Sequence, residues 1–339
     1  MAQPTMRAWI VDRPGQIAER PLRLVERPIP TPGRHEVRVR VSVCGVCRTD
    51  LHLAEGDLIP RRRGVVPGHE VVGVVDEVGD EVSRWAVGQR VGIAWLRWTC
   101  GVCRFCVRGH ENLCVAPRFT GWDDDGGYAE YAVVHQDYAY PLPHDVSDEE
   151  AAPLLCAGII GYRALRRSHL PGEGRLGLYG FGASAHLAAQ VALSEGADVY
   201  VMTRKPSARD LAVRLGATWV GDATDAPPER LDSAILFAPA GSLVPVALAA
   251  LDRGGTLAIA GIHLSDIPEL NYDRHLFYER NLCTVTANTR VDGASFLSLA
   301  SMAPLTVVSD VRPFEEAENV LRDLAEDRIT GVAVIRVAS

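Results

Sequence analysis

The chain has 339 residues, of which 47% are hydrophobic and 23% are charged, and its formal net charge is −8. This composition is typical of a globular protein long enough to form two domains, each with its own core. The acidic balance and the lack of a long basic block argue against nucleic-acid or anionic-membrane partners.

The N-terminal segment has no apolar stretch after a basic start, which argues against a secretory signal. No segment is apolar for the roughly 18 residues that a membrane-spanning helix needs. We therefore expect a cytoplasmic protein without a membrane partner. Because thiols stay reduced in that compartment, the eight cysteines indicate metal binding rather than disulfides.

The first 150 residues are predicted to be rich in β-strands. Residues 35–46 alternate apolar and polar side chains, residues 65–79 are dense in valine, and residues 88–96 continue the pattern. Frequent glycine and proline indicate a barrel-like or sandwich-like sheet with functional loops. Three arginines at 61–63 and three aspartates at 123–125 are interpreted as solvated loop segments.

Four cysteines follow the spacing C-x2-C-x2-C-x7-C at Cys100, Cys103, Cys106 and Cys114. Four thiols at this spacing can bind one structural zinc ion. An iron–sulfur cluster is the alternative, but ferredoxin-type runs place the fourth cysteine three residues on and follow it with proline. Seven residues intervene here, so zinc is favoured.

Residues 148–168 are predicted to form a helix that begins with a capping box between Ser147 and Glu150. From about residue 174, short apolar strands alternate with helical segments. The strands are expected at 175–180, 197–203, 217–221, 231–238 and 256–261, and the helices at 183–196, 206–216 and 244–255. This alternation predicts an α/β fold with a doubly wound parallel sheet. An amphipathic helix and a closing strand follow within residues 313–337.

Gly180, Gly182 and Ala185 lie between a predicted strand and a predicted helix, which is the context of the dinucleotide-binding fingerprint. The glycines permit a tight turn and a close approach of the pyrophosphate, which would bind at the helix N-terminus. Ala185 still permits close packing of the helix on the strand.

The second strand ends with Thr203, Arg204 and Lys205 instead of the carboxylate that NAD sites usually carry. Two cations could hold a 2′-phosphate, so NADP(H) is favoured over NAD(H). The alternative is that both cations are exposed to solvent and do not influence the choice of cofactor.

Cys47, His69 and Cys156 could form a second metal site with an open fourth position, as catalytic zinc requires. Scattered ligands cannot be recognised from spacing alone, and an isolated His69 would more often be an ordinary loop histidine.

The chain resembles the zinc-containing medium-chain alcohol dehydrogenases, a family of the medium-chain dehydrogenase/reductase superfamily. The resemblance covers essentially the whole chain and rests on motifs in the family's order. These are GVCRTDLH, PGHEVVGVVDEVG, VGIAWL, the four-cysteine segment, DGGYAEY, AAPLLCAG and the glycine-rich turn. It implies a GroES-like β-rich catalytic domain from residues 1–152 with 290–339, and a Rossmann coenzyme domain from residues 153–289.

The resemblance also implies roles for individual residues. The catalytic zinc ligands would be Cys47, His69 and Cys156, with Glu70 as a neighbour and occasional ligand. Asp50 would orient His69, whereas Thr49 and His52 would pass the alcohol proton to solvent. The structural zinc would be held by Cys100, Cys103, Cys106 and Cys114, which gives two zinc ions per chain.

Arg48 would contact the cofactor pyrophosphate, and Trp95 lies where the family commonly places a substrate-pocket residue. One position departs from the family pattern, because Val332 replaces an arginine near the pyrophosphate. Arg48 or Arg290 could compensate.

The expected activity is the interconversion of alcohols with aldehydes or ketones by hydride transfer to or from NAD(P). A homo-oligomer, either a tetramer or a dimer, is expected by analogy. Two alternatives remain: a quinone or enoyl reductase of the same superfamily, and a non-catalytic redox regulator that binds zinc and a dinucleotide.

Overall fold

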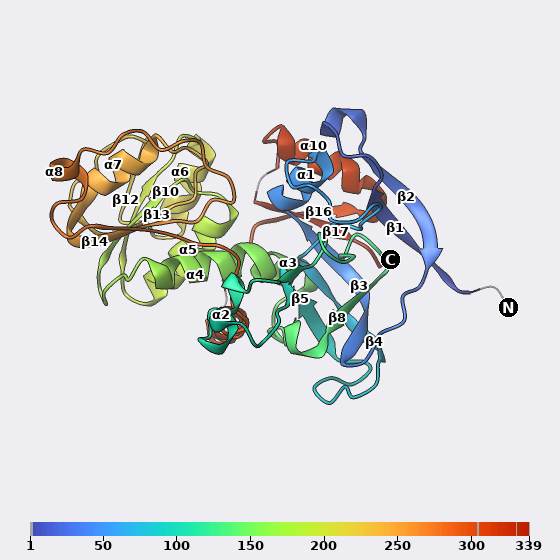
Figure 1. Cartoon of the computed structure of the whole chain (residues 1–339). Helices are drawn as coiled ribbons and strands as arrows, with labels where there is room; N and C mark the ends of the chain where they lie inside the picture. The colour runs from blue at the N-terminus through green and yellow to red at the C-terminus, as the bar shows by residue number, and fades with distance from the viewer. Residues whose placement is uncertain (1–2, 304, 330, 339) are drawn as a thin grey trace. The chain divides into compact units, whose positions relative to one another are not determined.

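The computed structural model describes residues 3–303, 305–329 and 331–338, which form two compact units (Figure 1). Unit 1 comprises Met1–Cys156 and Ala287–Ser339, and unit 2 comprises Ala157–Thr286. The sequence placed a boundary after residue 152. The boundary at Cys156 instead keeps this cysteine in the same unit as Cys47 and His69.

Unit 1 is built on a seven-stranded sheet around β3 (Glu36–Val46), which pairs antiparallel with β4 (Val71–Val78), β8 (Tyr131–His135) and β17 (Val332–Arg336). The valines of β3 alternate with Arg38 and Arg40, so one face of the strand is buried. The sheet is completed by β5 (Arg90–Ile93), β9 (Ala139–Tyr140) and β16 (Ser309–Pro313). Unit 1 also contains two antiparallel two-stranded sheets. One pairs β1 (Thr5–Val11) with β2 (Leu22–Pro28), and the other pairs β6 (Leu96–Trp98) with β7 (Arg118–Phe119).

The helices of unit 1 are α1 (Arg48–Glu55), α2 (Arg104–Val107), α3 (Asp148–Pro153), α9 (Arg290–Met302) and α10 (Ala317–Ala325). The predicted capping box of Ser147 and Glu150 is confirmed at the start of α3. The helix predicted over 148–168 is interrupted by a π-helical turn, Leu154–Gly158, before α4 (Ile159–Arg167) in unit 2.

Unit 2 contains a parallel six-stranded sheet in the order β12-β11-β10-β13-β14-β15. Its strands are β10 (Arg175–Tyr179), β11 (Asp198–Met202), β12 (Trp219–Gly221), β13 (Leu231–Leu236), β14 (Leu251–Ile259) and β15 (Asn281–Thr284). The connecting helices are α5 (Ala183–Ser194), α6 (Pro206–Arg214), α7 (Leu243–Ala250) and α8 (Tyr272–His275). When the strands are numbered from β10 in chain order, their order in the sheet is 3-2-1-4-5-6, which is typical of dinucleotide-binding domains. The predicted α/β fold is therefore confirmed.

One predicted boundary in unit 2 is wrong. The helix expected at 244–255 ends at Ala250, because β14 begins at Leu251 and pairs with Leu231 of β13. Within the described ranges, no helix has both the length and the apolar character that a membrane crossing requires.

Candidate functional site

The structure brings Cys47, His69, Glu70 and Cys156 together in unit 1, with one ligand atom from each within 4.8 Å of the others. Cys47 directly precedes α1, His69 and Glu70 directly precede β4, and Cys156 lies in the π-helical turn. The His69 Nε2 atom lies 3.3 Å from the Cys156 Sγ atom. Two sulfurs, an imidazole nitrogen and a carboxylate oxygen are donor types that bind zinc.

The Asp50 carboxylate holds the segments that carry two of these side chains. Its Oδ2 atom accepts a hydrogen bond from the Cys47 backbone N–H at 3.0 Å, as part of the capping box of α1. Its Oδ1 atom accepts the Gly68 N–H at 3.0 Å and lies 3.1 Å from His69 Nδ1. Because an ionised carboxylate only accepts, it fixes the proton on Nδ1 and leaves Nε2 directed at the cluster.

Two glycines allow the chain to approach this cluster closely. Gly68 has φ +97°, and a Cβ atom there would lie 2.4 Å from the Tyr128 ring. A Cβ atom on Gly45 would lie 1.9 Å from Glu70 Oε2. Neither position has room for a larger residue, so both glycines are required by the site's geometry.

Burial and mutual contacts set the electrostatics of the cluster. A hydrogen bond from Cys156, supported by His69, holds the pKa of Cys47 well below its usual range, whereas the same bond raises the pKa of Cys156. Burial opposes protonation of His69, but the nearby Asp50 carboxylate raises its pKa overall. Burial also raises the pKa of Glu70, whose Oε2 atom has no hydrogen-bond partner within the described part of the chain. A buried carboxylate oxygen without a partner, beside two thiols, fits a bound cation.

Thr49 and His52 lie three residues apart on α1, next to the cluster. The Thr49 Oγ1 atom is 3.5 Å from Cys47 Sγ. The His52 Nδ1 atom is 2.9 Å from Asp57 Oδ2, a contact that sequence reasoning missed. The signal was available, because Asp57 follows the Gly56 that ends α1 and this reversal returns the chain towards His52.

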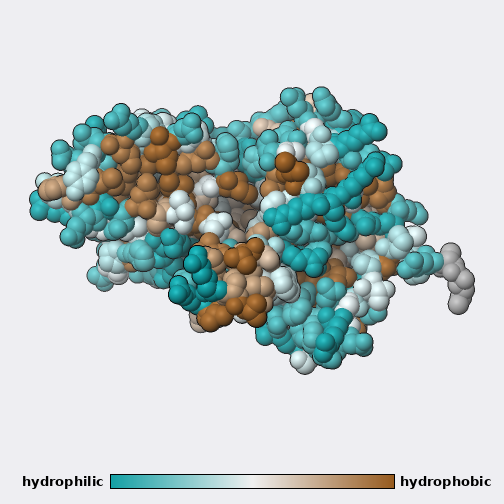
Figure 2. Space-filling model, viewed as in Figure 1, coloured by the Kyte–Doolittle hydropathy of each residue, from teal (hydrophilic) through white to brown (hydrophobic). Residues whose placement is uncertain are grey.

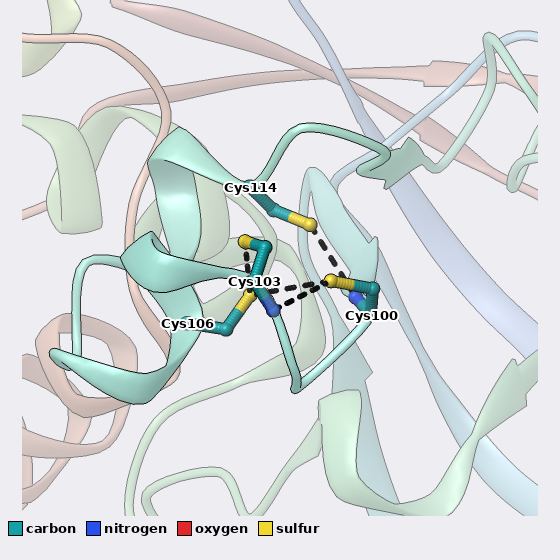
Figure 3. A group of neighbouring side chains, drawn as sticks. All are labelled: Cys100, Cys103, Cys106 and Cys114. Carbon is teal, nitrogen blue, oxygen red and sulfur yellow. Dashed lines mark hydrogen bonds between the residues drawn. The ribbon is translucent and has the colours of Figure 1, made fainter.

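The four cysteines at 100–114 form the second cluster, in which the side chains point towards a common centre (Figure 3). Their Sγ atoms lie within 4.8 Å of one another, and those of Cys103 and Cys106 are 3.5 Å apart. Backbone N–H groups donate to the sulfurs, from Cys103 to Cys100 and from Cys100 to Cys114, both at 3.3 Å. All four positions are provided by the protein, so this centre is closed to substrate.

These backbone donors favour thiolates. The N–H groups of Cys106 and Val115 lower the pKa of Cys103 to about 6. Burial and hydrogen bonds within the cluster raise the pKa of Cys106 to about 12. A group of thiols that shares protons in this way is suited to lose them to a metal ion.

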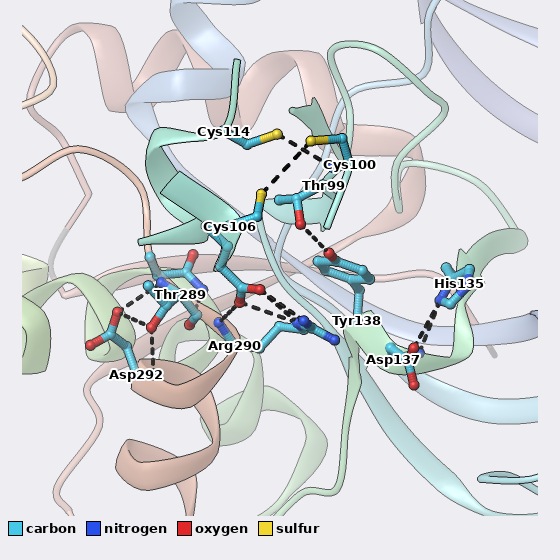
Figure 4. Close-up of polar contacts among 12 residues, drawn as sticks. Thr99, Cys100, Cys106, Cys114, His135, Asp137, Tyr138, Thr289, Arg290 and Asp292 are labelled. Atoms are coloured by element: carbon cyan, nitrogen blue, oxygen red, sulfur yellow. Dashed lines mark hydrogen bonds and ion pairs between the residues drawn. The ribbon is translucent and has the colours of Figure 1, made fainter. Parts of the chain in front are cut away.

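The four-cysteine segment is anchored to the start of α9 by a polar network (Figure 4). Glu111, three residues before Cys114, accepts four hydrogen bonds from the backbone and guanidinium of Arg290 at 2.5–3.1 Å. The Arg290 guanidinium lies 4.8 Å from the centre of the Tyr138 ring, whose hydroxyl is 2.7 Å from that of Thr99. The Arg290 guanidinium is therefore already paired with the Glu111 carboxylate.

The surface of the same segment is apolar. Figure 2 shows hydrophobic side chains gathered over the region around α2. Val102, Val107 and Val115 are 71–82% exposed. Little apolar packing holds this segment, so its order depends on the cysteine cluster and on the network around Glu111.

Trp95 lies beside the first cluster within a stack of aromatic rings. Its ring centroid is 5.1 Å from that of His69 in an edge contact and 4.8 Å from that of Phe119 in a stacked one. Trp122 stacks on the same indole at 5.9 Å. The apolar character of this wall agrees with a pocket for the carbon skeleton of a small molecule.

The arginines at 61–63 are exposed loop residues, as predicted, whereas the aspartates at 123–125 are half-buried and form ion pairs. Arg61 pairs with Asp123 at 2.6 Å and lies 4.0 Å from the centre of the Trp122 ring. Arg62 pairs with Asp125. These contacts hold the loop after α1 to the turn that carries Trp122. The pairing could not be predicted, because the two runs are about 60 residues apart in the chain.

The glycine-rich turn in unit 2 has the expected context between β10 and α5. Gly180 has φ +86°, and its N–H donates to the Met202 carbonyl at 2.8 Å. A Cβ atom added to Gly182 would meet nothing within 4 Å, so open space lies beside the helix N-terminus. Ala185 is fully buried. This geometry can accommodate a pyrophosphate.

Thr203, Arg204 and Lys205 follow β11, where Thr203 is buried and both cations are exposed. Lys205 is the single lysine of the sequence. In unit 1, Arg48 donates to Asp327 at 2.7 Å and is half exposed, and Val332 is buried as the first residue of β17.

Four similarities to known proteins accompany this geometry. Residues 33–144 match the family model "Alcohol dehydrogenase GroES-like domain". The chain is 56% identical over 338 residues to the Mycobacterium tuberculosis protein named "Probable alcohol dehydrogenase AdhA", with 98% of each chain covered. The structure resembles a cobalt- and zinc-bound thermostable alcohol dehydrogenase from Pyrobaculum aerophilum, with a TM-score of 0.88 and 26% identity over 98% of this chain and 100% of the other. It also resembles an NADP-bound dehydrogenase from Sinorhizobium meliloti, a proposed zinc-binding protein, with a TM-score of 0.86 and 26% identity over the same shares.

Proposed function

The chain belongs to the zinc-containing medium-chain alcohol dehydrogenase family, and on that premise we propose which of its residues carry the reaction. The protein is a zinc-dependent oxidoreductase that interconverts alcohols with aldehydes or ketones by hydride transfer to or from NAD(P). The observation that supports the assignment of residues is the convergence of Cys47, His69, Glu70 and Cys156.

Cys47, His69 and Cys156 hold the catalytic zinc in this proposal, with Glu70 as a neighbour able to act as a further ligand. The ion supplies Lewis acidity to the substrate oxygen when bound. The protein residues contribute geometry: Asp50 fixes the ring of His69 and the backbone of Cys47 with one carboxylate. The cluster formed by Cys100, Cys103, Cys106 and Cys114 holds the second, structural zinc.

Thr49 and His52 move the alcohol proton. Thr49 lies against Cys47 and can accept a hydrogen bond from a substrate hydroxyl. The His52 Nδ1 atom lies 2.9 Å from Asp57 Oδ2, so a proton taken up at Nε2 can leave the ring from Nδ1 towards Asp57. Asp57 is 67% exposed, which places the end of the path at solvent. Trp95 borders the substrate.

The cofactor is NADP(H) in preference to NAD(H). Gly180, Gly182 and Ala185 receive the pyrophosphate, and Arg204 and Lys205 after Thr203 neutralise the 2′-phosphate. Arg48 remains the candidate for a pyrophosphate contact, which requires it to leave Asp327. Arg290 is not proposed for this role, because Glu111 already occupies its guanidinium.

The eight free cysteines agree with a cytoplasmic location, and we propose a homo-oligomer, either a dimer or a tetramer. Light scattering after size exclusion measures the oligomeric state. A monomer would contradict this part of the proposal.

The decisive experiment combines a spectrophotometric panel of primary, secondary and aromatic alcohols with both cofactors and metal analysis of the same preparation. We expect alcohol-dependent reduction of NADP+, a higher kcat/KM for NADP+ than for NAD+, and two zinc ions per chain. A clear preference for NAD+ would contradict the cofactor choice, and fewer than two zinc ions would contradict one of the two sites.

A further inference from the structure

The segment after β11 is held in place from the neighbouring strand. The Thr203 N–H donates to the carbonyl of Gly221, the last residue of β12, at 3.1 Å. Thr203 is buried, whereas the next side chain, that of Arg204, is exposed. The direction in which Arg204 and Lys205 leave the sheet is therefore determined by the backbone of this segment.

Arg209 of α6 fixes that backbone through its guanidinium. Its Nε atom donates to the Thr203 carbonyl at 2.8 Å, and its Nη2 atom donates to the Arg204 carbonyl at 3.1 Å. Two successive carbonyls are thus held by one planar group. An arginine can do this because its donors have a fixed fork geometry, which a lysine ammonium lacks.

The same guanidinium also neutralises a carboxylate. Asp222 follows β12 directly, and its Oδ2 atom lies 2.6 Å from Arg209 Nη2. Asp222 is half exposed. It lies at the end of β12, next to the end of the neighbouring strand β11. A carboxylate without a counter-charge here would repel a 2′-phosphate and favour a free ribose hydroxyl.

We propose that Arg209 is a positioning residue for the cofactor 2′-phosphate, which acts by fixing the Thr203–Arg204 backbone and by neutralising Asp222. The inference rests on the proposed preference for NADP(H) and assigns part of that preference to a side chain outside the motif. Arg209 itself does not contact the phosphate in this proposal.

The test measures binding of two probes by calorimetry, without turnover. Adenosine 2′,5′-bisphosphate carries the 2′-phosphate and 5′-AMP lacks it. We expect Arg209→Gln to weaken the bisphosphate about tenfold while changing 5′-AMP by less than about twofold. Adding Asp222→Asn to this variant should recover part of the loss, because the uncompensated carboxylate is removed.

Arg214→Gln is the matched control, because it removes the same charge from the last residue of α6, where the arginine is exposed. It should change neither affinity by more than about twofold. If Arg209→Gln does not fold, Arg209→Lys tests the fork geometry with the charge retained and should also weaken the bisphosphate selectively.

Equal weakening of both probes by the Arg209 variants, or no weakening, would overturn the inference. A double variant that recovers nothing would overturn the role assigned to Asp222. A wild-type protein that binds 5′-AMP as tightly as the bisphosphate would instead contradict the cofactor proposal, so the two failures are distinguishable.

Discussion

Asp50 shows how much of the site depends on a single side chain. Its two carboxylate oxygens hold the Cys47 backbone, the Gly68 backbone and the His69 ring at 3.0–3.1 Å. The sequence motifs predicted a link from Asp50 to His69 only. The bond to Cys47 was not predicted, because it required knowing that α1 begins with Cys47 as its N-cap.

The first prediction concerns the ligands of the catalytic site. Cys47→Ser or His69→Ala should lower kcat/KM by at least about 10³-fold, because the ion is lost or misplaced. Far-UV circular dichroism should stay unchanged, and metal analysis should report one zinc ion fewer. Cys283→Ser is the control, since this half-buried thiol of unit 2 lies outside both clusters. Near-wild-type turnover in either ligand variant would remove this cluster from the mechanism.

The second prediction concerns the proton path. Asp57→Ala should lower kcat about threefold to tenfold with little change in KM, because the His52 ring loses the carboxylate that faces its Nδ1 atom. Asp57→Asn retains an acceptor oxygen and should lose less. Steady-state kinetics over a range of pH compares the three proteins. If Asp57→Ala has wild-type kcat throughout, Asp57 has no part in proton transfer.

At the scale of elements, those with a clear local pattern were predicted better than those that depend on tertiary contacts. The alternating valines of β3 and the strand–helix alternation of unit 2 are local patterns, and both were confirmed. Neither α1 nor α9 was predicted. Residues 251–255 were assigned to a helix, although pairing with β13 makes them part of β14. These errors arise where tertiary contacts override local preference.

The third prediction concerns the attachment of the four-cysteine segment to α9. Glu111 is about 10% exposed, so Arg290→Met leaves a buried carboxylate without its main partner. The free energy of unfolding should fall by about 2 kcal/mol, measured by urea denaturation.

Arg34→Met is the control for this measurement, because its pair with Glu81 is more than half exposed. That loss should stay below about 0.5 kcal/mol. Equal losses in the two variants would show that the network around Glu111 contributes no more than a surface ion pair.

At the scale of the whole molecule, the order of motifs along the chain was sufficient to predict the family and both clusters. The residues proposed to hold the catalytic zinc come from three separate segments, around Cys47, His69 and Cys156. Spacing alone could not predict that they meet, because it says nothing of long-range contacts. The pairing of Arg61 and Arg62 with distant aspartates was missed for the same reason.

The fourth prediction concerns metal removal from the whole protein. Treatment with a strong chelator should release two zinc ions per chain and lower Tm by about 5–10 °C, because a bound ion stabilises only the folded state. Calorimetry combined with metal analysis measures both quantities. Zinc added back should restore the original Tm. An unchanged Tm after complete removal would contradict the structural role of the four-cysteine cluster.

Lysine occurs only once in the sequence, at position 205, and this has a practical consequence. Amine-directed reagents have one side-chain target in the entire chain, and that target is exposed after β11. A fluorescent ester would therefore label Lys205 and the terminal amine only. If Lys205 holds the cofactor as proposed, the rate of its labelling reports cofactor occupancy optically, and resin coupled through this residue would hold the protein by the edge proposed to receive the adenosine.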